Sequence, residues 1–170
     1  GKYDTSASTG TITVTSPTIS GKITEITTEL TEFAKANKFF GLADPDVTAV
    51  ADDVNTFANI KLAEAETNGV ITATMKSDEG IAALKTADIS TADTRSRHNL
   101  SFDTQVAGIQ AADLKYADAR TNGTIDATSV TSITGKSAEV LEVMNSTGIS
   151  NFGTAETIIL TDNPSVTTLN

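Results

Sequence analysis

The apolar positions in the last third of the chain first follow the period of a strand and then that of a helix. Residues 125–133 are rich in Thr, Ser, Val and Ile, a composition typical of one β-strand. Ser137 is the expected N-cap and Gly148 the expected end of a short helix. Its apolar residues at helical spacing are Val140, Leu141, Val143 and Met144. Residues 158–160 predict a second strand, and Asp-Asn-Pro at 162–164 predicts a further helix start.

The first part of the chain carries longer helical patterns. An amphipathic stripe predicts one helix, and its apolar members are Ile23, Ile26, Leu30, Phe33 and Ala34. We expect Asp53 to cap a second helix that ends at Asn68-Gly69, a pair typical of left-handed C-caps. The apolar side chains predicted for this second helix are Val54, Phe57, Ala58, Leu62 and Ala65. Strands and helices therefore alternate along the chain.

Three landmarks recur in the same order and mark an internal repeat. The first runs from a Lys to a Gly and leads into a Thr/Ile/Val strand. Its copies begin at Lys2, Lys61 and Lys115 and occupy 2–15, 61–74 and 115–128. The second is a Gly-Lys turn, at 19–23 and 133–137, with a degenerate form at 78–81. The third is an apolar strand that runs into an Asp, at 47–52, 100–103 and 158–162.

The repeat predicts three units, at 1–59, 60–113 and 114–170, the second of which is degenerate. Each unit reads as strand, helix, strand, helix, which favours an α/β fold with a parallel sheet. We expect the units to stack as a solenoid and to share one hydrophobic core. The alternative is three small α/β beads, each with a core that is thin for independent stability.

Composition and charge narrow the function classes. The chain is 38% hydrophobic and 5% aromatic, which suits thin layers of Ile, Val, Leu and Ala. A net charge of −10 argues against nucleic acid as a partner. No apolar run approaches the length of a membrane span, so membrane insertion is not expected. The absence of Cys excludes disulfides, thiolate catalysis and Cys-ligated zinc.

The Thr/Ser/Ala-rich pattern at 121–140, followed by Thr-Asp-Asn-Pro-Ser-Val at 161–166, carries a resemblance. It is similar to the tandem repeats of very large secreted or cell-surface, adhesin-like proteins of marine bacteria, cyanobacteria among them. The third unit matches best, and the second departs most at residues 94–99. The resemblance implies an extracellular, structural or adhesive role and supplies no catalytic residues.

Two motifs invite a ligand-binding interpretation. Gly135-Lys136-Ser137 has the end of a phosphate-binding loop, but Val130 stands where that motif needs its first Gly, so we expect a strand-to-helix turn. Carboxylates at Asp44, Asp46, Asp52 and Asp53 are candidate ligands for Ca²⁺. They lack the spacing of an EF-hand loop, and capping of helices also explains Asp53, Asp103 and Asp162.

His98 is the sole histidine, and a transition-metal site is therefore not expected. Together with Arg95 and Arg97 it predicts a solvated basic loop, which would suit an acidic neighbour. No other cofactor is implied.

These features predict a non-catalytic repeat segment of an extracellular fibre, a surface layer or a giant surface protein. Its expected partners are further copies of the repeat, in a longer chain or in neighbouring subunits, and cell-surface glycans. Two alternatives are a carbohydrate- or cell-binding module, and a subunit of a self-assembling filament or viral appendage.

Overall fold

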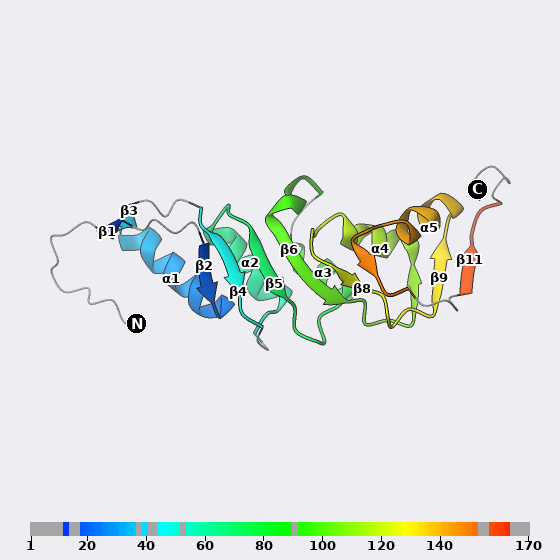
Figure 1. The fold of residues 1–170 in the computed structure, drawn as a ribbon, viewed down its shortest axis with the longest axis horizontal. Helices are drawn as coiled ribbons and strands as arrows, with labels where there is room; N and C mark the ends of the chain where they lie inside the picture. Colours follow the sequence, from blue (N-terminus) through cyan, green and yellow to red (C-terminus); the bar gives the residue numbers. More distant parts are fainter. Residues whose placement is uncertain are drawn as a thin grey trace.

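The computed structural model is elongated and describes residues 12–13, 18–36, 39–40, 44–51, 54–89, 92–152 and 157–163 (Figure 1). The five described α-helices are α1 (Ile23–Ala36), α2 (Phe57–Glu66), α3 (Ile81–Ala87), α4 (Ala111–Asp118) and α5 (Ser137–Met144), with a 3₁₀ helix η1 at Ala92–Arg97. The strands before η1 are β1 (Ile12–Thr13), β2 (Thr18–Gly21), β3 (Phe39–Phe40), β4 (Asp46–Ala49) and β5 (Ile71–Thr74). Those after it are β6 (His98–Asp103), β7 (Gly108–Gln110), β8 (Ile125–Asp126), β9 (Ser132–Gly135), β10 (Ile149–Ser150) and β11 (Thr157–Leu160).

Every strand pair in the described residues is parallel. The largest sheet has six strands in the order β2-β4-β5-β6-β8-β10, so that each strand lies beside a later one at a nearly constant step along the chain. Its register pairs include Ile19 with Val47, Val47 with Ile71, Ile71 with His98, Phe102 with Ile125, and Ile125 with Ile149. A second sheet, β7-β9-β11, repeats this step, and β1 pairs with β3. The expected α/β fold with a parallel sheet is confirmed.

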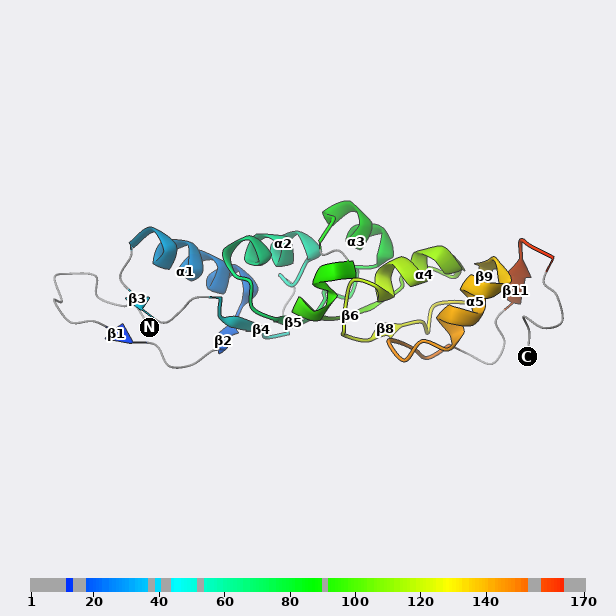
Figure 2. The same ribbon diagram turned by 90° about the horizontal axis from the view of Figure 1, so that it is seen from above.

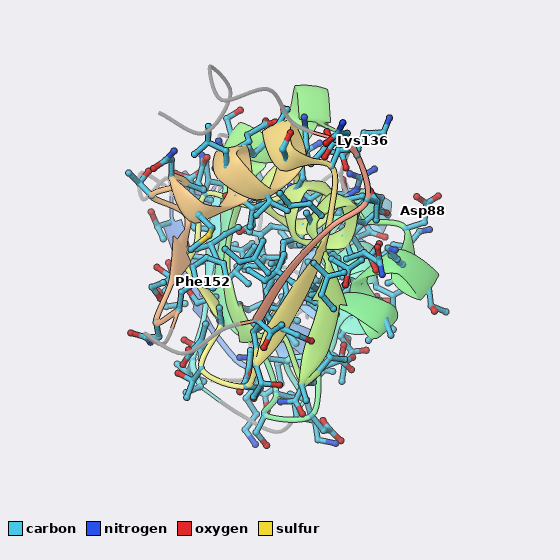
Figure 3. All side chains as sticks on the ribbon, turned by 90° about the vertical axis from the view of Figure 1, so that its right-hand side faces the viewer. Asp88, Lys136 and Phe152 are labelled. Atoms are coloured by element: carbon cyan, nitrogen blue, oxygen red, sulfur yellow. The ribbon has the colours of Figure 1, made fainter. Side chains whose placement is uncertain are left out.

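The helices lie in a row along one side of the molecule, opposite strands of the large sheet (Figure 2). Each of α2, α4 and α5 buries residues spaced three apart, as a helix does when one narrow face meets a core. A view along the long axis shows the side chains gathered between the helices and the strands, with Asp88 and Lys136 on the outside (Figure 3). The core is aliphatic, apart from an edge-to-face pair of Phe57 and Phe102 whose ring centroids are 5.3 Å apart.

The predicted strand at 125–133 is wrong in its extent, because it divides into β8 and β9, which belong to different sheets. The cause is a turn after β8. The Asp126 carboxylate accepts hydrogen bonds from both the amide and the hydroxyl of Thr128, and the Val130 amide donates to Ala127 O. Residues that look like one β-branched run therefore change direction between two strands.

The predicted caps also need correction. Lys136, not Ser137, is the N-cap of α5, and Ser137 is its first helical residue. Thr56 caps α2, through a hydroxyl that accepts from the Asn59 amide, so the cap is not Asp53, which lies outside the described residues. α2 ends at an extended C-cap, Thr67, instead of a left-handed Asn68-Gly69 pair.

The buried face of α2 is formed by Phe57, Ile60 and Ala63, whereas Leu62, which the pattern placed on it, is 58% exposed. The helix predicted from 162–164 lies outside the described residues beyond Asn163. The division into three units stays a prediction, and its boundaries after residues 59 and 113 fall inside α2 and α4. No described helix has both the length and the apolar character that crossing a membrane requires.

Candidate functional site

The two described candidates for calcium ligands bind the next turn of the chain. The exposed Asp44 accepts hydrogen bonds at one oxygen from the amide and the side chain of Asn68, at 3.0 and 2.8 Å. Asp46 accepts from the Val70 amide at 2.7 Å. Asp52 and Asp53 lie outside the described residues. Within the described ranges, no three His, Cys, Asp or Glu side chains gather closely enough to hold a metal ion. Calcium binding by this group stays a prediction.

The Gly-Lys-Ser motif forms the expected strand-to-helix turn, since β9 ends at Gly135 and α5 begins at Ser137. The Ser137 amide and hydroxyl both donate to the Asp162 carboxylate, each at 2.9 Å. These bonds lower the pKa of Asp162 below its ordinary value, with the Ser137 amide as the largest cause. Asp162 therefore does serve a helix N-terminus, but that of α5, which precedes it in the chain. Asp103 caps no helix; its carboxylate accepts from the Gln105 amide within a turn.

The basic loop prediction is wrong for His98. It is the first residue of β6 and is fully buried, with Nε2 3.7 Å from a carboxylate oxygen of Glu64. Arg95 and Arg97 lie close to it in the chain and bind backbone carbonyls on either side. Arg95 Nε donates to Thr121 O at 2.8 Å, and an Arg97 guanidinium nitrogen donates to Thr67 O at 2.5 Å. The arginines tie η1 to neighbouring loops, so these donors point into the protein itself.

A recurrent Thr/Ser-x-Gly turn precedes three strands of the large sheet. It occurs at 67–69, 121–123 and 146–148, and in each copy the hydroxyl accepts from the Gly amide. The buried Thr121 hydroxyl also accepts from the Leu100 amide, and it lies 2.7 Å from Leu100 O. A Cβ on Gly123 would collide with Leu100 O, which explains why glycine stands there. The first two copies belong to the Lys-to-Gly landmark of the sequence, but their role as connectors was not predicted.

One lysine position recurs along the row of helices, and we call it the lysine row: Lys61, Lys85 and Lys115. Each follows a buried residue of its helix and reaches the helix ahead. The Lys61 ammonium donates to Ala87 O, Lys85 pairs with Asp113, and Lys115 pairs with Glu142 at 2.6 Å. The bond and charge of Glu142 raise the pKa of Lys115 above its ordinary value. Single-sequence reasoning missed this row because the spacing of its members is irregular.

An open groove of about 240 Å³ separates α1 and α2. It is lined by Thr24, Thr27, Thr28, Thr31, Asn59 and Leu62. The hydroxyls of Thr27, Thr28 and Thr31 donate to carbonyls one turn earlier in their own helix. The groove contains no titratable side chain among its lining residues and offers no general acid or base.

Comparisons with protein-family models, with curated proteins and with solved structures gave no match.

Proposed function

We propose that this chain is a non-catalytic structural or adhesive repeat segment of an extracellular fibre, surface layer or giant surface protein, built as a solenoid. The observation that carries the proposal is the nearly constant step of the large sheet, in which each strand pairs in parallel with a later one. The β4–β5 and β6–β8 pairs span the predicted boundaries between units, which favours one continuous stack over separate beads.

Side-chain contacts with a similar step support this interpretation. Asp46 binds the Val70 amide, Lys85 pairs with Asp113, and Asp162 binds the Ser137 amide. In a solenoid each turn of the chain, here called a coil, contacts only its neighbours, and contacts at one coil length dominate. In separate beads, most such contacts would close within one bead.

The polar chemistry of the described residues also favours a structural role. The side chains that the sequence singled out for metal, phosphate or acidic ligands bind backbone groups of adjacent coils, as Asp44, Asp162 and Arg97 do. Such bonds hold neighbouring coils together. The extracellular setting rests on the resemblance to secreted repeats and on the acidic, cysteine-free composition.

The length of the native polypeptide is the first test. A chain several times longer than this one, with further copies of the repeat, would support the array, whereas a chain of about the present length would favour a self-assembling subunit. Antibodies against the purified chain should label intact source cells without permeabilisation, and labelling only after permeabilisation would contradict an extracellular location. A glycan screen completes the test, because saturable binding at one site would favour a carbohydrate-binding module.

A further inference from the structure

Exposed apolar side chains concentrate at the C-terminal end of the described structure. Seven large hydrophobic residues are exposed among those described, and four of them belong to α5 and β11. They are Leu141 (44%), Met144 (41%), Ile158 (46%) and Ile159 (48%). We call the surface formed by these four residues the end face. Clustered exposure of this kind is typical of an interaction surface, whereas scattered exposure needs no explanation.

The end face continues a row of the interior. Ile109, Ile133 and Ile158 are register partners in the β7-β9-β11 sheet, and their exposed fractions are 6%, 0% and 46%. Ile158 therefore occupies a core position that is covered on one side only. Ile159 stands in register with Thr134, and an apolar residue there replaces a polar one. Within the described residues β11 pairs with β9 alone, so its other edge is open to pairing with another strand.

The helix at this end departs from the lysine row. Val140 is the central buried residue of α5, and the residue after it is Leu141 where α2, α3 and α4 carry lysine. In the inner helices this position reaches the helix ahead. A surface with leucine here selects an apolar partner, because an acidic residue placed against it would lose water without gaining a cation.

We propose that the end face binds the end face of a second copy of this chain, with α5 beside α5 and β11 beside β11 about a two-fold axis. A two-fold contact places like against like, and this surface is apolar on both sides. A head-to-tail contact would instead bring α1, with its exposed Glu25 and Glu29, against Leu141 and Met144. Burying these carboxylates against apolar side chains is unfavourable. The contact is independent of the proposed function: in a longer array the same face would receive a further coil.

Sedimentation of the full chain over about 1 μM to 1 mM tests the contact. The expected result is a monomer–dimer equilibrium that shifts toward dimer between about 0.15 M and 1 M NaCl, because salt screens the repulsion between two chains of charge −10. Leu141→Lys should weaken dimerisation at least tenfold. Leu62→Lys, on the 58% exposed leucine of α2, is the matched control and should leave the dimer unchanged. Circular dichroism checks that both variants are folded. A monomer at every concentration, or equal dimerisation of both variants, would overturn the proposal.

A cysteine placed in this naturally cysteine-free chain identifies the geometry. Under mild oxidation Met144→Cys should give a disulfide-linked dimer at concentrations where Leu62→Cys stays monomeric, because only the two-fold contact brings two copies of residue 144 together. Oligomers larger than dimers in sedimentation, with no cross-linking of Met144→Cys beyond that of Leu62→Cys, would show head-to-tail association and exclude the two-fold contact. Neither outcome bears on whether the native protein is an extracellular array.

Discussion

At the scale of single residues, buried hydroxyls satisfy backbone groups in the interior of this aromatic-poor chain. Thr121 is 2% exposed, and its hydroxyl accepts from the amides of Leu100 and Gly123 while facing the carbonyl of Leu100. One side chain thereby satisfies backbone groups of two neighbouring coils. An amide left without an acceptor in this position would lose the full free energy of its hydration.

Thr121→Val should therefore destabilise the protein by about 2–4 kcal/mol, because it keeps the volume of the side chain and leaves two buried amides without an acceptor. Thr124→Val is the matched control at a nearby exposed position, and it should change the free energy of unfolding by less than about 0.5 kcal/mol. Urea denaturation of the three proteins measures both. Equal stability of the two variants would show that the Thr121 hydroxyl is not a connector.

Asp162 gives a pH signature of the bond between neighbouring coils. Its pKa is lowered in the folded protein by the Ser137 amide and hydroxyl, relative to about 3.9 in an unfolded chain. Its stabilising effect is therefore present above the unfolded-state pKa and is lost as the pH falls through the folded-state pKa. Asp162→Asn should melt below the wild type at neutral pH, and the two melting temperatures should converge as the pH falls below the folded-state pKa. A gap that stayed constant with pH would mean that the carboxylate charge is not involved.

At the scale of elements, position within a row of the sheet decides how much each strand residue contributes. Ile133 has a register partner on both sides in its row, whereas Ile158 has one among the described residues. Removing a fully enclosed side chain leaves a cavity, but a half-exposed side chain leaves a space that water fills.

Ile133→Ala should therefore cost about 3–5 kcal/mol, and Ile158→Ala less than about 2 kcal/mol. Because the two residues are register partners with the same side chain, each variant is the control for the other. The measurement is urea denaturation at a concentration below that of any association. An equal loss at both positions would show that the end of the β7-β9-β11 sheet is covered as completely as its middle.

The elements also show how far local reasoning reaches. The strands of the large sheet and helices α1 and α5 were predictable because their apolar spacing lies within a short stretch of chain. The break between β8 and β9 was not, since it depends on the Asp126 carboxylate turning back on Thr128. The interaction that fixes the start of α5 comes from Asp162, a full coil downstream, and a cap read from adjacent residues misses it. Likewise His98 looks like a loop residue beside two arginines, but the register of β6 turns it into the core.

At the scale of the whole molecule, the proposed solenoid makes stability a property of neighbouring coils. A coil that loses its neighbour loses register partners, a core row and the side-chain bonds between coils at the same time. Folded domains have a margin of only about 5–15 kcal/mol, and each large aliphatic side chain that is uncovered forfeits roughly 1.5–3 kcal/mol. One unit on its own is then expected to fall below the threshold for folding.

Thermal melts of nested fragments test this claim most directly. Cuts in the loops at Asn68 and Asn122 avoid the helices and give fragments 68–170 and 122–170 for comparison with the full chain. The account predicts that 122–170 is largely unfolded or self-associated by circular dichroism and sedimentation, that 68–170 melts at an intermediate temperature, and that the full chain melts highest. A monomeric 122–170 that melts cooperatively at the temperature of the full chain would show that the units are independent beads, and would contradict the solenoid.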